Sequence, residues 1–557
     1  MPHGKQRRSV RAAAMPVEKA PDSSELEQGT DLSATAAHSD GGQPDASGAN
    51  ESITRGSRWL WLLAAVVVAL YAAGINEHWR IQRDGALYLS IGRSLAEGQG
   101  YTYNYQPHTL ALPGFPVIIA AVFRIFGESF LALNVLISLM GLACIALSWL
   151  LLRELRLPRG TLIASFLLIA LSRLLYYYSG HILTEVPFTL FALLALWSGE
   201  RMLRAEKPGF WFWCAAAALL SICATAIRPF GPALTVALMG ALWLSPRGAR
   251  PWRRNFGASA LIVISFGLAV GLWMYRTAQV RTPADPTYLV AFRGGRVLQL
   301  LAWALSVLPQ LLTAVGEAIF GVGATWVGGL CVTALILWGL LRLIAQGERL
   351  LPIYAAVHVA GICLSSPGRR YLVPALPILY CSLVIGAEAA AAWAEKRRIF
   401  GPVAKRRTLT VLLVLLAIGN VSRIAKVVVQ NRTPDFYGSL DKGRWSRYFQ
   451  AADWLKHNAD PNTSVIGYES RVLHFMTRLR TVQLPSDTTP EQATSMKDVI
   501  LRKDVGYAIL DPDKAGSTRA LEELFRQHPG AAETALKIGD VTIVRVHPDK
   551  LGSPPGN

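Results

Sequence analysis

The sequence predicts an α-helical polytopic membrane protein with about eleven transmembrane helices and a C-terminal extracytoplasmic α/β domain. Three observations lead to this prediction. Only 17% of the 557 residues are charged and 52% are hydrophobic, whereas soluble proteins usually carry about 25% charged residues. Apolar runs close to the roughly 20 residues that cross a bilayer recur through the middle of the chain. The last 128 residues instead alternate short helix-like and strand-like segments.

Residues 1–57 are predicted to form a disordered cytoplasmic tail. They are rich in Ser, Ala, Gly, Asp and Glu and contain almost no aromatic residues, so they cannot bury enough apolar surface to offset the entropy of the chain. The segment is also too long and too polar for a signal peptide.

A transmembrane domain is predicted over residues 58–429. The eleven predicted spans are 59–75, 131–152, 161–178, 186–203, 210–227, 230–245, 257–275, 324–341, 351–366, 372–393 and 408–429. Basic connectors follow the even-numbered spans, and the strongest, at 396–398 and 405–407, follows the tenth. Because Lys and Arg concentrate on the cytoplasmic side, we expect the N-terminus inside the cytoplasmic (inner) membrane and the C-terminal domain outside.

Two outward loops are long in this topology, 76–130 and 276–323. The second contains the apolar segment 296–322. Counting that segment as a span would move the basic cluster of residues 396–407 to the outer side, against the distribution of the other connectors. We therefore expect it to lie in the membrane interface or to re-enter the membrane.

The charge and the cysteines exclude several classes of protein. The net charge of +19 lies entirely in residues 59–429, which hold 32 Lys and Arg against 13 Asp and Glu. A nucleic-acid-binding protein needs a basic soluble surface, so we expect no nucleic-acid partner. The six cysteines all fall in apolar segments without metal-ligand spacing, which argues against a disulfide framework and a zinc site.

The C-terminal region, residues 430–557, is predicted to be a small α/β domain. Helices are predicted at 446–458, 490–503 and 517–528, and strands at 463–468, 505–510, 533–538 and 541–546. The last two strands are expected to form a hairpin.

Asp84, in the first outer loop, is a candidate general base. It opens a short amphipathic stretch in which Tyr88 follows at i+4 and Leu87 and Ile91 mark an apolar face. One interpretation is an N-cap aspartate on a helix lying at the membrane surface. The other is catalytic, because a helix terminus would hold the carboxylate rigidly where it can reach a substrate proton.

Glu185, at the outer start of the fourth predicted span, is the second candidate. Glu185 and Pro187 both suit the first turn of a helix, so a structural role is the alternative to a functional one. Asp84 and Glu185 nevertheless share the outer membrane surface. His181, four residues earlier, is expected to be a polar interface residue rather than a metal ligand.

Arg369, Arg370 and Tyr371 form the third candidate site, in an outward turn. Two adjacent outer arginines oppose the general distribution of positive charge. They could snorkel to lipid headgroups, or they could bind a phosphate, to which Arg presents a planar, bidentate fork. Other outer arginines could join them: Arg173, Arg228, Arg293 and Arg296.

At these three places the sequence resembles the GT-C superfamily of polytopic glycosyltransferases, in particular protein O-mannosyltransferases and aminoarabinose–lipid A transferases. The matching pieces, in order, are Asp84-xxx-Tyr88, Gly98-Gln99-Gly100-Tyr101, Pro113-Gly114-Phe115-Pro116, Thr184-Glu185-Val186-Pro187 and Arg370-Tyr371-xx-Pro374-xx-Pro377. They match over residues 59–395. The protein mannosyltransferases typically carry an Asp-Glu pair in the first loop, whereas Asp84 is followed by Gly85.

This resemblance implies an inverting hexosyl- or pentosyltransferase with a polyprenyl-phosphate sugar donor and a hydroxyl acceptor on a glycan, lipid or protein. Asp84 would be the general base, and Glu185 would place the acceptor or share that role. Arg370, together with Arg369, would stabilise the leaving lipid phosphate, and Tyr88, His181 and Tyr371 would contact substrate. Without a carboxylate–histidine cluster, we expect no metal and no cofactor other than the lipid-linked substrate.

Two other function classes remain. A transporter or lipid flippase would carry ionisable residues at the membrane midplane and broken helices in paired positions, and Glu388 and Pro309 lie in or near apolar segments. A membrane assembly factor would instead use the outer domain to bind partners.

Overall fold

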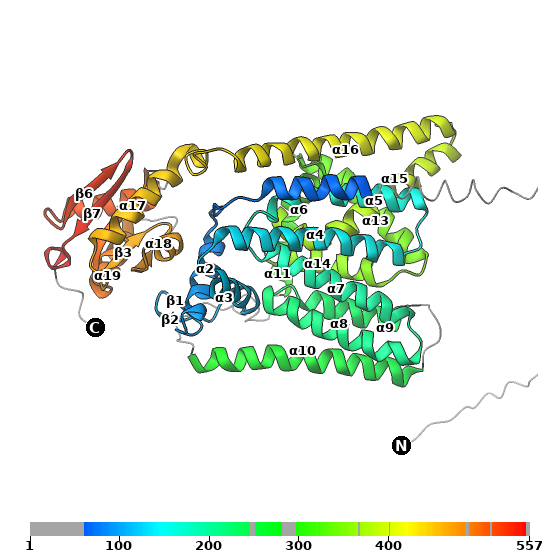
Figure 1. Cartoon of the computed structure of the whole chain (residues 1–557), viewed down its shortest axis with the longest axis horizontal. Helices are drawn as coiled ribbons and strands as arrows, with labels where there is room; N and C mark the ends of the chain where they lie inside the picture. Colours follow the sequence, from blue (N-terminus) through cyan, green and yellow to red (C-terminus); the bar gives the residue numbers. More distant parts are fainter. Residues whose placement is uncertain are drawn as a thin grey trace, which may run out of the picture. The chain divides into compact units, whose positions relative to one another are not determined.

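The computed structural model describes residues 61–245, 251–280, 297–321, 323–365, 368–399, 401–484, 490–512 and 515–552. The predicted tail, residues 1–57, lies outside the described residues. Leu62–Asn557 forms one compact unit, whose residues contact mainly one another. Within it, long helices run side by side and a mixed sheet follows near the C-terminus (Figure 1).

Eight helical segments of the described chain are long and apolar enough to cross a membrane. They are α4 (Phe130–Glu154), α5 with α6 (Arg159–Ala170 and Arg173–Tyr178), α7 (Glu185–Arg204), α8 (Lys207–Ile227), α10 (Trp252–Val280), α13 (Trp326–Ala345), η2 with α15 (Arg369–Ala375 and Leu376–Lys396) and α16 (Pro402–Asn431). Each coincides with a predicted span.

The other three predicted spans are shorter helices: Trp61–Gly74, α9 (Pro232–Leu244) and α14 (Leu350–Ser365). The 13 residues of α9 cover about 20 Å at 1.5 Å per residue, less than the roughly 30 Å of a hydrocarbon core. Hydropathy therefore identified eleven helices, of which eight meet the length of a full span.

Residues 296–322 do not form a single long helix. The segment contains α11 (Val297–Ser306) and α12 (Leu308–Phe320), and Pro309 stands in the first turn of α12. Proline suits this position because a first-turn N–H has no intrahelical acceptor. Each helix is too short to span a membrane alone, and the interfacial or re-entrant placement of the segment stays a prediction.

The first long loop, residues 76–130, folds into α2 (Arg83–Ala96), the hairpin β1 (Thr102–Tyr103) and β2 (Gln106–Pro107), and α3 (Gly114–Phe126). The predicted apolar face of α2 is correct, because Leu87 and Ile91 are buried together with Ala111. The N-cap interpretation of Asp84 is wrong: Gln82 is the N-cap, and Asp84 is the second residue of the helix.

The C-terminal region is mixed α/β, as predicted. Its elements are η3 (Asp441–Gly443), α17 (Arg444–Asn458), β3 (Ser464–Gly467), α18 (Ser470–Thr477), β4 (Arg480–Gln483), α19 (Pro490–Arg502), β5 (Val505–Leu510), α20 (Ala515–Gln527), β6 (Ala532–Ile538), β7 (Val541–Val546) and η5 (Pro548–Leu551). The strand order is β4-β3-β5-β7-β6. Strand β3 is parallel to β4 and β5, and β7 is antiparallel to β5 and β6.

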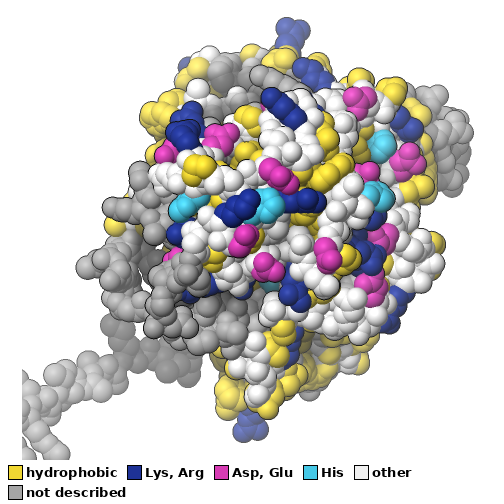
Figure 2. Space-filling model, turned by 90° about the vertical axis from the view of Figure 1, so that its left-hand side faces the viewer, with side chains coloured by type: hydrophobic (Ala, Val, Ile, Leu, Met, Phe, Trp, Pro, Cys, Tyr) yellow, Lys and Arg dark blue, Asp and Glu magenta, His cyan; other side chains and the backbone are white. Residues whose placement is uncertain are grey.

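Every predicted element of this region is present, but α18 and β4 were not predicted. Both are short, at eight and four residues, so neither offers enough residues for a clear periodicity. Helix α18 packs against α2, at the same end of the long helices as α3 and the hairpin (Figure 1). Viewed from this end, basic, acidic and histidine side chains are interspersed over the surface (Figure 2).

The two most buried of the eight candidate spans begin at the predicted charged motifs. Within the 18-residue apolar stretch of each span, 89% of η2 with α15 and 72% of α7 is buried. The corresponding share is 50% or less in the other six spans. Arg370 lies at the start of the first and Glu185 at the start of the second. The core of the helical region therefore positions both charged side chains at one end.

Candidate active site

Asp84 lies at the start of α2, and its carboxylate contacts two arginines from different parts of the chain. Oδ2 accepts a hydrogen bond from Nη1 of Arg370 at 3.0 Å, and Oδ1 accepts one from Nη1 of Arg471 at 3.2 Å. The Asp84 side chain is 35% exposed, so it is held by charge and remains accessible to a substrate.

Glu185 is the first residue of α7 and is buried, with 1% of the residue exposed. Its Oε1 lies 3.0 Å from Nη1 of Arg228 and 3.9 Å from Nε of Arg370. Its Oε2 has no hydrogen-bond partner among the described residues. Burying a carboxylate is costly unless it is paired, and the two guanidinium groups provide that pairing.

Arg370 connects the two acids. Besides these contacts, its Nη2 donates to the hydroxyl of Tyr371 at 2.7 Å. The Tyr371 ring lies 4.8 Å from the guanidinium carbon of Arg370 and 4.9 Å from that of Arg228, in the range of cation–π contacts. Tyr371 therefore helps to hold both arginines in place.

The backbone brings α2 unusually close to the loop before α7. A Cβ added at Gly85 would lie only 2.9 Å from the carbonyl oxygen of Ile182. Glycine is thus required for this approach, and a larger residue after Asp84 would move α2 away from Glu185. This contact accounts for the glycine that follows Asp84.

The resulting cluster, which we call the Asp84 cluster, consists of Asp84, Glu185, Arg228, Arg370 and Arg471. Three guanidinium groups face two carboxylates, which leaves one positive charge in excess. The planar fork of an arginine can bind two oxygens of a phosphate at once. The cluster can therefore hold an anionic phosphate while keeping a carboxylate beside it.

Three of the predicted site residues have other surroundings. Nη1 of Arg369 donates to Glu317 at 3.1 Å, and the Tyr88 ring packs edge-on against Phe115 at 5.6 Å. His181 is buried and its Nδ1 lies 2.7 Å from the carbonyl oxygen of Tyr177. Burial lowers the pKa of His181 to about 3, so it is neutral at physiological pH.

Arg228 is one of the arginines that the sequence suggests as partners of Arg370, whereas Arg471 is not predicted. It lies on α18, 387 positions after Asp84, and no local pattern marks it. The neighbouring Arg83 pairs with Glu469 at 2.7 Å, and Arg444 pairs with both Glu469 and Asp511. These pairs tie the C-terminal region to the start of α2. Arg293 and Arg296 lie outside the described residues.

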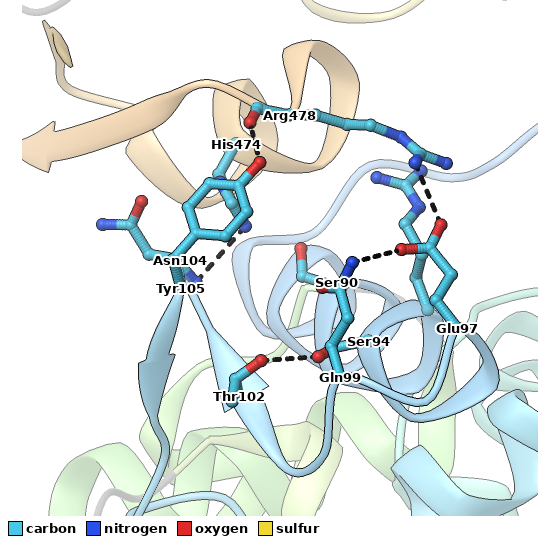
Figure 3. A pocket seen from close by; sticks show the side chains of 10 residues that line it. Ser90, Ser94, Glu97, Gln99, Thr102, Asn104, Tyr105, His474 and Arg478 are labelled. Carbon is cyan, nitrogen blue, oxygen red and sulfur yellow. Dashed lines mark hydrogen bonds and ion pairs between the residues drawn. The ribbon is translucent and has the colours of Figure 1, made fainter. Parts of the chain in front are cut away.

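A small polar pocket lies further along α2, between this helix, the β1–β2 hairpin and α18 (Figure 3). Its volume is about 60 Å³ and its lining includes Ser90, Ser94, Thr102, Asn104 and His474. The Asn104 N–H donates to Nε2 of His474 at 3.3 Å, and Nδ1 of His474 lies 2.8 Å from the carbonyl oxygen of Leu479. Burial lowers the pKa of His474 below its ordinary value.

An apolar cavity of about 360 Å³ lies on another side of the Asp84 cluster. It is lined by residues of α8, α9 and α10 and of the segments just before α3 and α9, including Pro113, Ala226, Pro229, Phe266 and Trp273. Arg228, the C-cap of α8, stands between two of these lining residues in the sequence. The chain at Arg228 therefore runs past the cavity.

In the part of the chain that the structure describes, no group of three or more His, Cys, Asp or Glu residues is placed to hold a metal ion. The charge-stabilising groups of this site are arginines.

Residues 107–275 match the family model described as dolichyl-phosphate-mannose-protein mannosyltransferase. This segment contains Glu185 and Arg228 but neither Asp84 nor Arg370. No curated protein matches the chain in a sequence comparison.

Solved structures are similar over most of the chain. ArnT from Cupriavidus metallidurans, in the apo state, is 14% identical with a TM-score of 0.59, covering 90% of this chain and 100% of that one. Its complex with undecaprenyl phosphate is also 14% identical with a TM-score of 0.59, and the match covers 89% of this chain and 99% of that one. A third similar structure is the archaeal oligosaccharyltransferase AglB from Archaeoglobus fulgidus, in complex with an inhibitory peptide and a dolichol-phosphate. It is 11% identical with a TM-score of 0.54, and the match covers 87% of this chain and 74% of that one. These comparisons confirm the resemblance to GT-C membrane glycosyltransferases at the level of the fold.

Proposed function

We propose that this protein is an inverting glycosyltransferase that moves a sugar from a polyprenyl-phosphate donor to a hydroxyl acceptor on the outer face of the cytoplasmic membrane. The observation that carries the proposal is the contact of Arg370 with Asp84 at 3.0 Å and with Glu185 at 3.9 Å. It combines an accessible carboxylate and a phosphate-binding cation in one site.

In this mechanism Asp84 takes the proton of the acceptor hydroxyl as the acceptor oxygen attacks the anomeric carbon. The bond from that carbon to the phosphate oxygen breaks, and its electron pair leaves with the lipid phosphate. Attack opposite the leaving group inverts the anomeric configuration. A cation fixed at the phosphate lowers the barrier because negative charge grows there in the transition state.

The arginine contacts of Asp84 fit this sequence of events. An arriving phosphate offers Arg370 and Arg471 a second anion, so the hydrogen bonds that they donate to Asp84 can transfer to phosphate oxygens. Asp84 then has lone pairs free for the acceptor hydroxyl. The single excess positive charge of the cluster balances a phosphodiester that carries one negative charge.

Glu185 has a different role in this proposal from that of Asp84. It is buried and its Oε1 faces both Arg228 and Arg370. We therefore assign it to positioning these two arginines rather than to proton transfer. Its presence keeps the guanidinium groups at the outer ends of α8 and η2, where a lipid phosphate would lie.

The polyprenyl chain would occupy the apolar cavity beside Arg228. Residues such as Phe266 and Trp273 provide the apolar surface that a polyprenyl chain favours, and Arg228 adjoins the phosphate end. The complex of the structurally similar ArnT with undecaprenyl phosphate supports a lipid phosphate as the ligand class.

The acceptor would approach from the side of the C-terminal region. The polar pocket of Figure 3 presents hydroxyl groups on α2, the helix that carries Asp84, together with an amide from the β1–β2 hairpin and an imidazole from α18. Such groups suit the hydroxyls of a glycan, of a lipid headgroup or of a protein side chain.

The experiment that tests this function uses purified protein in vesicles with a series of labelled polyprenyl-phosphate sugars and candidate acceptors. Transfer of label to an acceptor with inverted anomeric configuration is the expected result. Movement of labelled lipid across the bilayer without any change in covalent bonds would instead identify a flippase.

The structure offers little support for the transporter alternative. Glu388 is an ionisable residue in an apolar segment, which is a feature of transporters. The Thr161 hydroxyl lies 3.0 Å from its Oε1 and 2.9 Å from its Oε2, and the carboxylate accepts a hydrogen bond from it. Thr161 lies in the first turn of α5, so this carboxylate lies near a helix end and has a partner there. A transporter site is expected near the membrane midplane.

A further inference from the structure

A second charged cavity lies at the outer ends of α6 and α16, and it shares no residue with the Asp84 cluster. Its volume is about 590 Å³. We call it the basic groove and define it by six of its lining residues: Arg173, Tyr177, Arg423, Lys426, Gln430 and Thr433.

The basic groove concentrates positive charge. Arg173, Arg423 and Lys426 line it, and the described lining residues include no Asp or Glu. Arg80 stands behind it and donates from Nη1 to Oε1 of Gln430 at 3.4 Å. The carboxylate of Asp435, in the following loop, accepts a hydrogen bond from the N–H of Gly438 at 2.8 Å.

These cations also repel one another. Arg173 interacts electrostatically with Arg423 and with Arg369, and its Nη1 is held by the carbonyl oxygen of Gly321 at 3.2 Å. Its Nε is buried and has no hydrogen-bond acceptor among the described residues. Cations gathered without acids favour a bound anion, which relieves their repulsion.

The position of the groove limits what that anion can be. Arg423 and Lys426 occupy the last turns of α16 before the C-terminal region, and α6 contacts η2, which carries Arg370. The groove therefore lies at the same end as the Asp84 cluster. Positive charge at the outer membrane surface opposes the usual distribution, but it suits the phosphates of lipid headgroups.

Helix α16 also provides an apolar surface that leads to the groove. Leu415, Ile418 and Val429 are 62%, 59% and 69% exposed. Only 22% of the 18-residue apolar stretch of this helix is buried. A lipid tail can lie along this surface while its headgroup reaches Arg423 and Lys426.

We propose that the basic groove is a binding site for the phosphate of an outer-leaflet lipid headgroup. Arg173 and Arg423 present planar forks to the phosphate oxygens, and Lys426 adds a point charge. The same chemistry is offered by a polyprenyl-phosphate carrier and by an anionic phospholipid.

The test measures lipid binding by native mass spectrometry on the full chain in a phosphate-free detergent. The probes are undecaprenyl phosphate, phosphatidylglycerol and the phosphate-free undecaprenol. Arg423→Gln/Lys426→Gln removes two charges from the groove. Arg502→Gln/Lys503→Gln removes two charges from the exposed end of α19 and is the matched control.

Binding of the phosphate lipids should weaken about 10- to 30-fold in the groove variant and less than about twofold in the control. The charge-conserving variant Arg423→Lys/Lys426→Arg should keep most of the binding. Loss for both phosphate lipids indicates a general headgroup site, and loss for undecaprenyl phosphate alone indicates a carrier site; either supports the proposal. Unchanged binding in a folded groove variant, or undecaprenol binding as tightly as undecaprenyl phosphate, would overturn it.

The same titration in an Arg370→Gln background separates this proposal from the proposed function. If Arg370→Gln leaves lipid binding unchanged while the groove variant loses it, the phosphate assignment of the Asp84 cluster fails and the groove stands. If only Arg370→Gln weakens binding, the groove proposal fails and the cluster stands.

Discussion

Nη1 of Arg471 lies 3.2 Å from Oδ1 of Asp84, although 387 positions separate the two residues. Arg471 belongs to α18 of the C-terminal region and Asp84 to the first turn of α2. The C-terminal region thus contributes a charge to a site whose other members come from one end of the helical region. This contact makes it a part of the active site in the proposed function.

Arg471→Gln should raise KM for the sugar donor about tenfold. This corresponds to a loss of ~1.4 kcal/mol of binding free energy, which is near the low end of the usual contribution of a hydrogen bond to a charged group. The reason is that the cluster loses its excess positive charge. Arg471 and Asp84 are both about one-third exposed, so the effect on the melting temperature should be small. Steady-state kinetics at varied donor concentration measure the change.

Arg83→Gln is the control for this variant, because the Arg83 guanidinium ties the same region to α2 by pairing with Glu469 at 2.7 Å rather than with the Asp84 carboxylate. It should leave KM for the donor near the wild-type value. Equal changes in KM for both variants would mean that Arg471 acts only as a structural tether.

Asp84→Asn should lower kcat about 10³-fold, in the range lost with a general base, while the binding of undecaprenyl phosphate persists. The amide keeps the size of the side chain but cannot take the acceptor proton. Single-turnover transfer and a lipid-binding titration on the same preparation measure the two effects. Wild-type turnover in this variant would exclude the base role.

Arg370→Lys should lower kcat/KM about 100-fold, as the loss of one transition-state donor does in other enzymes. Lysine keeps the charge but cannot contact Asp84, Glu185 and the Tyr371 hydroxyl with one planar group. Arg369→Lys is the matched control and should change kcat/KM less than about threefold, because Arg369 pairs with Glu317. A larger effect at Arg369 than at Arg370 would contradict the assignment of the phosphate site.

Gly85→Ala should destabilise the protein by about 1–3 kcal/mol, the usual cost of overpacking, and should reduce transfer activity. The added Cβ would meet the backbone oxygen of Ile182 at 2.9 Å, which cannot move without displacing the loop before α7. Gly160, in the first turn of α5, has open space around a Cβ, so Gly160→Ala should be neutral. Thermal melting in detergent compares the two.

The contact between α18 and the β1–β2 hairpin should weaken as the pH falls below about 6.5. Burial lowers the pKa of His474 in the folded protein, so below the ordinary histidine pKa the unfolded chain binds a proton that the folded one does not. Protonated Nε2 could no longer accept the Asn104 N–H. Limited proteolysis from pH 7.5 to 5.0 should show increasing cleavage in the wild type and a smaller change in His474→Gln.

The sequence was informative where the signal is local. Hydropathy located a helical segment at each of the eleven predicted spans, and alternation located β5 and the β6–β7 hairpin within one residue of their ends. It also pointed to Asp84, Glu185 and Arg370, which the fold brings together. These predictions depend on periodicity and on charges placed at helix ends, which are properties of neighbouring residues.

Only the tertiary structure decided which of these residues share a site. Arg369 and Arg370 are adjacent, but successive residues of a 3₁₀-helix point about 120° apart, so Arg369 reaches Glu317 while Arg370 reaches Asp84. Arg471 joins the cluster because α18 packs on α2, and the cationic side chains of the basic groove meet because α6 packs on α16. Sequence alone determined the helices and the charges at their ends, because both follow from local hydropathy. The pairing of those charges depends on contacts between distant segments, which exist only in the folded chain.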